Sequence, residues 1–380
     1  MAENKRLLSL DIMRGITIAG MIMVNNSGSG THYEPLGHAD WNGLTPTDLV
    51  FPFFMFIMGV SCCLSLRKFD FRPSSQVIIK IIRRAILIFA IGLAIAWFGM
   101  FFRGLMNGQA FVEAFMPFGN IRILGVLQRL ALCYGIGALI AVTINHKRLP
   151  WIIASMLIIY AIMIVIGNGY DNENYDSNII TIVDRAVLTS NHMYRPNFDP
   201  EGFLSTLPSI AHMLIGFCCG NMILRHKDNH RRVELMLLTG TALMFAGLLL
   251  SYGFPINKKI WSPTFVLTTC GMAAGLLGLL IWIIDIRGYR RWTGFFHVFG
   301  VNPLFLYVLA AVLSITVGAI TTVNAAGETV SLKKCFYYDT LVPLLGGDLK
   351  LASLIYALLM VTVCWAVGLV LYRRRIYIKI

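Results

Sequence analysis

The chain has 380 residues, of which 57% are hydrophobic and 13% are charged, and its formal net charge is +13. This composition excludes a water-soluble protein, because the apolar residues form runs of roughly 18–25, the length a helix needs to cross about 30 Å of hydrocarbon. The basic residues are sorted into alternate loops, which excludes nucleic-acid binding as the reason for the positive charge.

Ten apolar runs predict ten transmembrane helices, and their continuous Leu-, Ile- and Met-rich pattern lacks the alternation of barrel strands. The fold class is therefore all-α, a polytopic membrane protein. We expect one transmembrane domain over residues 1–380, and an inverted repeat of five plus five helices stays open. The predicted spans, in chain order, are 7–27, 49–66, 85–102, 121–144, 151–167, 207–224, 234–253, 262–284, 296–320 and 350–372.

One set of alternate loops, beginning with Lys5 and Arg6 and ending with Arg373 to Lys379, holds 21 of the 32 basic residues, whereas the opposite set holds nine. The positive-inside rule places the richer set, and with it both termini, in the cytosol. An even number of helices agrees with this topology. The first run contains Asp11 and Arg14, so we expect a retained helix and not a cleaved signal peptide.

Function should lie beneath the long loops of the non-cytosolic side, which are 28–48, 103–120, 168–206 and 321–349. The 168–206 loop is rich in Asn, Asp and Tyr and so has the side chains to contact a sugar, although the same composition suits any solvated loop.

Polar residues on the first helix form a stripe. Asp11 and Arg14 are three residues apart and can pair, while Arg14 and Asn25 are eleven apart and share nearly one helix face. A charge in hydrocarbon costs several kcal/mol when it is isolated, so each needs a partner or a function. The alternative is a structural ion pair with Asn25 as a cap.

A second polar cluster leads from the first outer loop into the second helix, from His38 to Asp48. Histidine can take or pass a proton near neutral pH, and a nearby carboxylate can fix its tautomer. The residue pattern alone does not separate a functional His38 from a solvated loop histidine, and it makes His32 an equally good candidate for the functional histidine.

The third place is Gln128-Arg129 in the fourth span, where an arginine fork could hold a phosphate or carboxylate. Arg14 reaches a similar depth from the cytosolic side. Two cations converging on one cavity suggest an anionic ligand, unless neighbours such as Asp11 neutralise them.

Several strings resemble the heparan-α-glucosaminide N-acetyltransferase family of transmembrane enzymes and its bacterial relatives. They occur in the family's order across residues 6–308. They are RLLSLDIMRG, MIMVNN, HADWNGLTPTDLVFPFFMFIMGVS, GVLQRLALCY, FDPEGFLSTLPSI, NKKIWSPTFVLTT and RRWTGFFHVFGVNPLFLYV.

The resemblance implies transfer of an acetyl group from cytosolic acetyl-CoA, with no metal, to the amine of a glucosamine-type sugar across the membrane. It makes His38 the catalytic histidine and Asn25 a neighbouring active-site amide, and it implies a cofactor cavity built by Asp11, Arg14, Asp48 and Arg129. Together with the mechanism this chemistry needs, it leads to the following expectations. His38, Asn25 and Asp48 are expected to be catalytic, Arg14, Arg129 and Asp11 to bind the cofactor, and Trp41, Asn42 and Glu201 to bind the sugar.

Two chemical routes remain open: His38 as general base, which we favour, or His38 as a nucleophile that carries the acetyl group. The rival function is a secondary transporter of amino sugars, which would use the same buried charges for coupling. The chain resembles a bacterial inner-membrane relative, and a homodimer is left open.

Overall fold

The computed structural model describes residues 7–378. Over these residues the chain is an all-α polytopic membrane protein with one small β-hairpin, which confirms the predicted fold class. Lys5, Arg6 and Lys379, which the charge pattern includes, lie outside the described residues. Within them, nine helices are long and apolar enough to span a membrane. These are α1 (Leu8–Asn25), α2 (Val50–Leu66), α3 (Ser75–Met106), α5 (Val126–Thr143), α6 (Leu149–Ile166), α8 (Thr206–Arg225), α9 (Asn229–Leu250), α10 (Pro263–Leu280) and α15 (Leu349–Arg373).

The tenth predicted span, 296–320, is a broken helix. It consists of α11 (Thr293–Val301) and α12 (Pro303–Ala319), which meet at 85°. Proline lacks the N–H that would continue the helix and disfavours helical geometry at the residue before it, here Asn302. The Asn302 side chain instead bonds the backbone of Ile376 and Ile378. The count of ten therefore holds if the bent pair crosses as one span.

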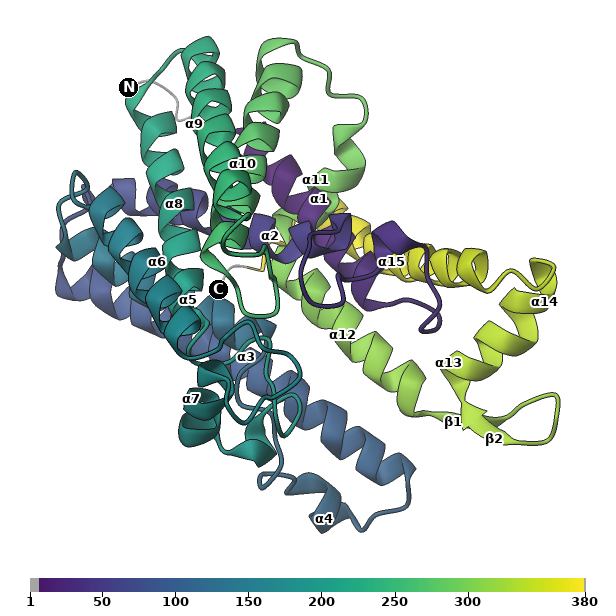
Figure 1. The fold of residues 1–380 in the computed structure, drawn as a ribbon. Helices are drawn as coiled ribbons and strands as arrows, with labels where there is room; N and C mark the ends of the chain where they lie inside the picture. Colours follow the sequence, from purple (N-terminus) through teal and green to yellow (C-terminus); the bar gives the residue numbers. More distant parts are fainter. Residues whose placement is uncertain (1–6, 379–380) are drawn as a thin grey trace.

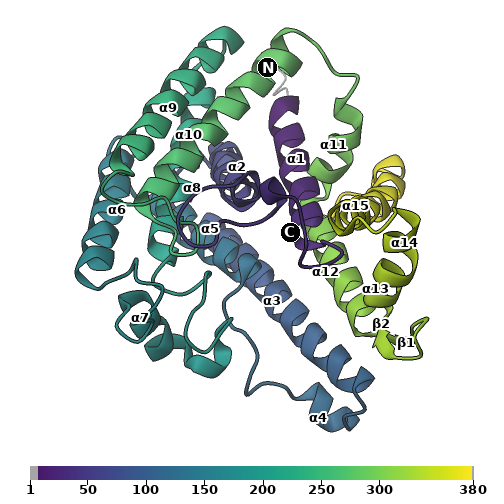
Figure 2. The same cartoon turned by 45° about the vertical axis from the view of Figure 1, so that its right-hand side comes forward.

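The shorter elements lie between the spans. They are α4 (Phe111–Phe115), α7 (Ile179–Leu188), α13 (Leu332–Cys335), α14 (Val342–Leu344), and the antiparallel strands β1 (Thr321–Val323) and β2 (Thr329–Ser331), in which Thr321 pairs with Ser331. In both ribbon views α4, α7 and the hairpin lie toward the lower end of the molecule (Figures 1 and 2). These elements belong to the long loops that the sequence predicts on the non-cytosolic side.

Helices α1 and α2 occupy the centre of the bundle. Helix α1 contacts α2, α11, α12 and α15, and α2 contacts α8, α5 and α10, an arrangement visible in Figure 2. The α2–α8 contact depends on two glycines: a Cβ at Gly59 would lie 2.1 Å from the carbonyl oxygen of Met213, and one at Gly216 would lie 2.2 Å from that of Phe56. Small residues let the two backbones approach closely, as is usual between membrane helices.

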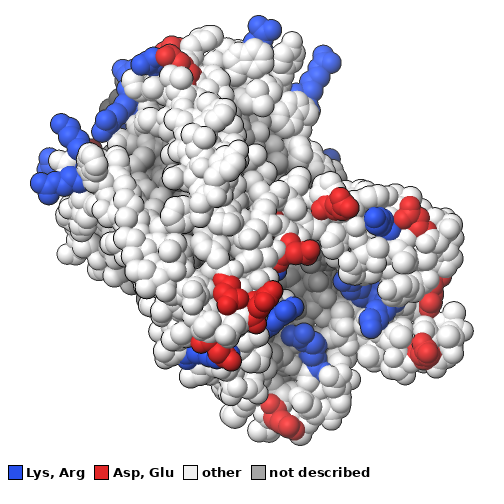
Figure 3. Space-filling model, in the orientation of Figure 1, with Lys and Arg blue, Asp and Glu red and all other residues white. Residues whose placement is uncertain are grey.

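Helix α3 begins ten residues before its predicted span. Its first turns carry Lys80, Arg83 and Arg84, whose long side chains can reach the membrane surface from within a helix. On the face drawn in Figure 3, many Lys and Arg side chains gather along the upper left margin, whereas most Asp and Glu lie at the centre, below it and to the right, together with other Lys and Arg around a hollow. The visible charge is therefore unevenly divided between the two ends of the molecule.

Candidate active site

Asp48 lies in a tight helical turn, Pro46–Leu49, that leads into α2. A reciprocal cap closes this turn: the Thr45 side chain accepts the N–H of Asp48, and the Asp48 carboxylate accepts the N–H of Thr45 at 3.2 Å. The N–H of Ala39 donates to the same carboxylate oxygen, Oδ2, at 3.1 Å. Asp48 is 1% exposed. These bonds fix its carboxylate and leave Oδ1 for another partner.

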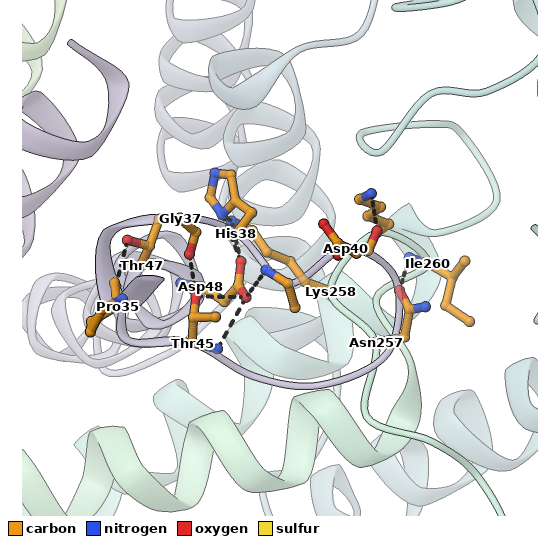
Figure 4. A network of polar contacts seen from close by, with 12 residues as sticks. Pro35, Gly37, His38, Asp40, Thr45, Thr47, Asp48, Asn257, Lys258 and Ile260 are labelled. Atoms are coloured by element: carbon orange, nitrogen blue, oxygen red, sulfur yellow. Dashed lines mark hydrogen bonds and ion pairs between the residues drawn. The ribbon is translucent and has the colours of Figure 1, made fainter. Parts of the chain in front are cut away.

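That partner is His38. Its Nδ1 lies 2.7 Å from Oδ1 of Asp48 (Figure 4), and half of the imidazole side chain is exposed. An ionised carboxylate can only accept a hydrogen bond, so this contact requires the hydrogen on Nδ1 and leaves Nε2 as the basic nitrogen. The structure thus brings His38 and Asp48 together, while their catalytic role stays a prediction.

Lys258 joins the same pair from the loop between α9 and α10. Its Nζ lies 3.1 Å from His38 Nδ1 and 3.2 Å from Asp48 Oδ1 (Figure 4). Burial lowers the pKa of Lys258 from the ordinary lysine value, and the Asp48 carboxylate opposes this shift. No residue pattern in the sequence indicates a role for this lysine, although the string NKKIWSPTFVLTT contains it.

The segment around Lys258 is fastened to the loop that carries His38. The N–H of Gly43 donates to the carbonyl of Ile256 at 2.7 Å, and the Asn257 side chain donates to Oδ1 of Asn42 at 3.2 Å. Lys259 donates to the carbonyl of Asp40. Asn42, a predicted sugar contact, is exposed, and this segment holds its side-chain oxygen.

Trp41, the second predicted sugar contact, lies mainly inside the protein. Its ring is 9% exposed and packs edge-on against Tyr175 and Phe198. The indole N–H donates to the carbonyl of Tyr170 at 2.9 Å. Trp41 thus ties the His38 loop to the 168–206 loop, and its surface offers little area to a ligand.

Glu201, the third predicted sugar contact, belongs to an ionic cluster. Arg122 donates to both Asp199 and Glu201, and its guanidinium lies over the ring of Tyr194. Burial alone would lower the pKa of Arg122, but the two carboxylates raise it above the ordinary arginine value. The Glu201 side chain is 14% exposed, so a small part of this cluster remains open to solvent.

The predicted pair on α1 is also formed. Nη1 of Arg14 lies 3.0 Å from Oδ1 of Asp11, and Nη2 donates to the hydroxyl of Ser61 at 2.6 Å. Both charged residues line a cavity of about 510 Å³ between α1, α2, α8 and α9. Its other basic lining residues are Arg67, Lys68 and Arg232.

Arg129 is not among the residues that line this cavity. It is fully buried near the start of α5, where Nη2 donates to the carbonyl of Gly202 at 3.0 Å and to Ser205, and where the guanidinium stacks 5.4 Å from the ring centre of Trp261. Its Nε and Nη1 find no hydrogen-bond partner among residues 7–378. Arg14 and Arg129 therefore have different surroundings, and a cofactor contact for Arg129 stays a prediction.

Asn25 and His32 are both exposed. Asn25 is the last residue of α1, and within residues 7–378 its side chain makes no hydrogen bond with another residue. His32 likewise makes no side-chain hydrogen bond in that part of the chain. The structure thus distinguishes the two loop histidines that the residue pattern left equal, because His38 contacts a carboxylate and His32 does not.

Comparison with known proteins identifies the family. The catalytic-domain model "Heparan-alpha-glucosaminide N-acetyltransferase, catalytic" matches residues 6–254, so the chain belongs to this family. Heparan-alpha-glucosaminide N-acetyltransferase of Mus musculus is 27% identical over 81% of this chain and 53% of its own length. The Homo sapiens protein of that name is 28% identical over 80% of this chain and 52% of its own. The chain thus spans about half the length of these relatives.

Proposed function

We propose that this member of the heparan-alpha-glucosaminide N-acetyltransferase family moves an acetyl group from acetyl-CoA to the amine of a glucosamine-type sugar on the opposite side of the membrane. The observation that carries the proposal is the 2.7 Å contact between His38 Nδ1 and Asp48 Oδ1, in a loop within the residues that the family model matches. The half-exposed imidazole can meet a substrate from solvent, and its partner carboxylate is fixed in place.

His38 would serve as general base. An amine attacks a thioester only as its free base, so the sugar ammonium must first lose a proton. Nε2 of His38 takes the proton, and Asp48 stabilises the imidazolium through the Nδ1–H bond. As the nitrogen–carbon bond forms, the carbon–sulfur bond breaks, the attacking nitrogen gives its second proton to the departing CoA thiolate, and His38 releases the first proton to solvent. Asn25 remains our candidate for holding the thioester carbonyl.

Lys258 supports this arrangement by its position. Nδ1 of His38 can either donate to Asp48 or accept from Lys258, but one nitrogen cannot do both. While Lys258 is balanced by the shared Oδ1 of Asp48, the imidazole keeps its hydrogen on Nδ1. The basic nitrogen, Nε2, is then available to the substrate.

The basic cavity beside α1 is our candidate for the CoA phosphates. Arg14, Arg67, Lys68 and Arg232 line it, and Asp11 is its one acid among the described lining residues. Guanidinium groups suit phosphate oxygens because their donors form a planar fork. The positive-inside rule places this cavity on the cytosolic side, and His38 on the other, which in a bacterial inner membrane is the periplasm.

The acceptor site would lie between the His38 loop and the 168–206 loop. Asn42 offers an exposed amide, and Glu201 offers a partly open carboxylate that could accept hydrogen bonds from a sugar hydroxyl or ammonium.

We favour direct transfer over an acetyl-histidine, since an acetyl-imidazole on a half-exposed ring would be open to hydrolysis. A covalent acetyl group trapped on His38 would overturn this preference.

His38→Ala, reconstituted in proteoliposomes, is the test. Acetylation of glucosamine should fall at least about 100-fold, the usual contribution of a general base. His32→Ala is the matched control, because it removes an exposed histidine of the same loop, and its activity should stay near that of the unaltered protein. Full turnover by His38→Ala would refute the base assignment, and movement of unmodified sugar without acetylation would favour a transporter.

A further inference from the structure

A second basic cavity lies between the C-terminal end of α2, the first turns of α3, and α5. It is on a different side of α2 from the 510 Å³ cavity that Arg14 lines. It measures about 210 Å³, and its lining includes Lys80, Arg83 and Arg84. No Asp or Glu lines it among the described residues. The proposed acetyl transfer does not use this cavity, so its three cations need another explanation.

Among the described residues, the cations have aromatic neighbours but no carboxylate partners. The guanidinium of Arg84 lies 4.8 Å from the ring centre of Tyr134, and the ammonium of Lys80 lies 5.1 Å from that of Phe69. Nε of Arg84 is buried and has no hydrogen-bond partner in the described part of the chain. Within residues 7–378, none of the three cations forms a salt bridge with Asp or Glu. An anion in the cavity would supply both the missing acceptor and the missing negative charge.

The surface around the cavity indicates what kind of anion would bind there. Lys80, Arg84 and Leu87 follow one face of α3 at helical spacing, so the face changes from basic to apolar toward the middle of the helix. Leu87 lines the cavity and is 40% exposed. Only 11% of an apolar 18-residue stretch of α3 is buried in the protein, so this helix is among the most lipid-exposed spans. A ligand there meets cations at one end and hydrocarbon at the other.

We propose that this cavity binds the headgroup phosphate of an anionic phospholipid, with the acyl chains along α3 beyond Leu87. Basic pockets between membrane helices on the cytoplasmic side are suited to such headgroups, and the positive-inside rule places the start of α3 on that side. Ser65 lines both this cavity and the larger basic cavity. A bound headgroup therefore fixes the α2–α3 connection at the edge of the proposed CoA site.

The experiment measures lipid retained by the purified full chain. The protein is placed in nanodiscs of phosphatidylcholine with a minor share of phosphatidylglycerol, extracted into mild detergent, and analysed by native mass spectrometry. The unaltered chain should retain phosphatidylglycerol selectively. Lys80→Gln with Arg84→Gln should lower that retention roughly 10- to 30-fold, since each basic residue near the membrane surface strengthens binding of an anionic headgroup about three- to fivefold.

Two further variants make the result specific. Arg373→Gln with Arg374→Gln removes the same charge from the exposed end of α15 and should leave retention unchanged. Lys80→Arg with Arg84→Lys keeps both cations and should also retain the lipid, which separates charge loss from misfolding. Equal retention by the Gln pair and the unaltered chain overturns the proposal, as does complete displacement of the lipid by CoA or by inorganic phosphate. None of these readouts requires acetyl transfer.

Discussion

Replacing Lys258 by Met tests the polar cluster at His38 because it removes one ammonium and keeps a side chain of similar length. Nζ of Lys258 lies 3.1 Å from Nδ1 of His38 and 3.2 Å from Oδ1 of Asp48. Two unit charges about 4 Å apart interact by about 1 kcal/mol in water and by about 4 kcal/mol near a protein surface. The smaller value already corresponds to about a fivefold change in an equilibrium constant.

The sign follows from the charges. An ammonium beside the ring opposes the formation of an imidazolium, so its removal favours protonation of His38. The acid limb of acetyl transfer, where the base becomes protonated, should therefore move to higher pH in Lys258→Met, and the rate at a pH on that limb should fall about fivefold. Full pH profiles of kcat and of kcat/KM measure this shift.

Two control variants define what would refute the reasoning. Lys258→Arg keeps the charge and should restore most of the original profile. Lys259→Met removes the adjacent lysine, which donates to the carbonyl of Asp40 and does not contact His38. The reasoning fails if the acid limb stays in place in Lys258→Met, or if Lys258→Arg and Lys258→Met shift it equally.

Three other predictions concern different parts of the molecule. Arg67→Gln should raise the KM for acetyl-CoA about fivefold, the effect of one phosphate contact of about 1 kcal/mol, and a raised KM for the sugar alone would contradict this. Burial raises the pKa of Asp184 to about 7, against about 3.9 in the unfolded chain. The contribution of this carboxyl group to the free energy of unfolding is therefore complete below pH 4 and is lost as pH rises through 7. Asp184→Asn, which stays neutral, should show an apparent Tm a few °C above that of the unaltered chain at pH 8 but not at pH 4. Gly216→Leu should abolish the monodisperse folded fraction in size-exclusion chromatography, because its Cβ would lie 2.2 Å from a carbonyl oxygen, whereas Gly318→Leu, with nothing within 4 Å of its Cβ, should behave normally.

Hydropathy was sufficient for most of the fold, because each long apolar run must satisfy its own backbone hydrogen bonds as a helix. It could not show the 85° break before Pro303, since a window average does not respond to one proline. It also began α3 too late, because Lys80, Arg83 and Arg84 lower the hydropathy of residues that are nevertheless helical.

The site was predictable where its residues are close in sequence. Asp48 lies ten residues after His38, and the reciprocal cap at Thr45 is a local signal. Lys258 comes from 220 residues away, so only its place in a family-like string could have drawn attention to it. Spacing along α1 correctly suggested that Asp11 and Arg14 pair, but no sequence pattern could show that Arg129 lies outside the cavity they line.

A sided vesicle assay tests the central claim most directly. Inside-out vesicles containing the full chain are loaded with glucosamine and then supplied with acetyl-labelled acetyl-CoA outside. The proposed function predicts labelled N-acetylglucosamine in the lumen while CoA remains outside, and it predicts loss of this product in His38→Ala. Product that forms only when both substrates are on the same side, or release of unmodified glucosamine without acetylation, would contradict transfer across the membrane.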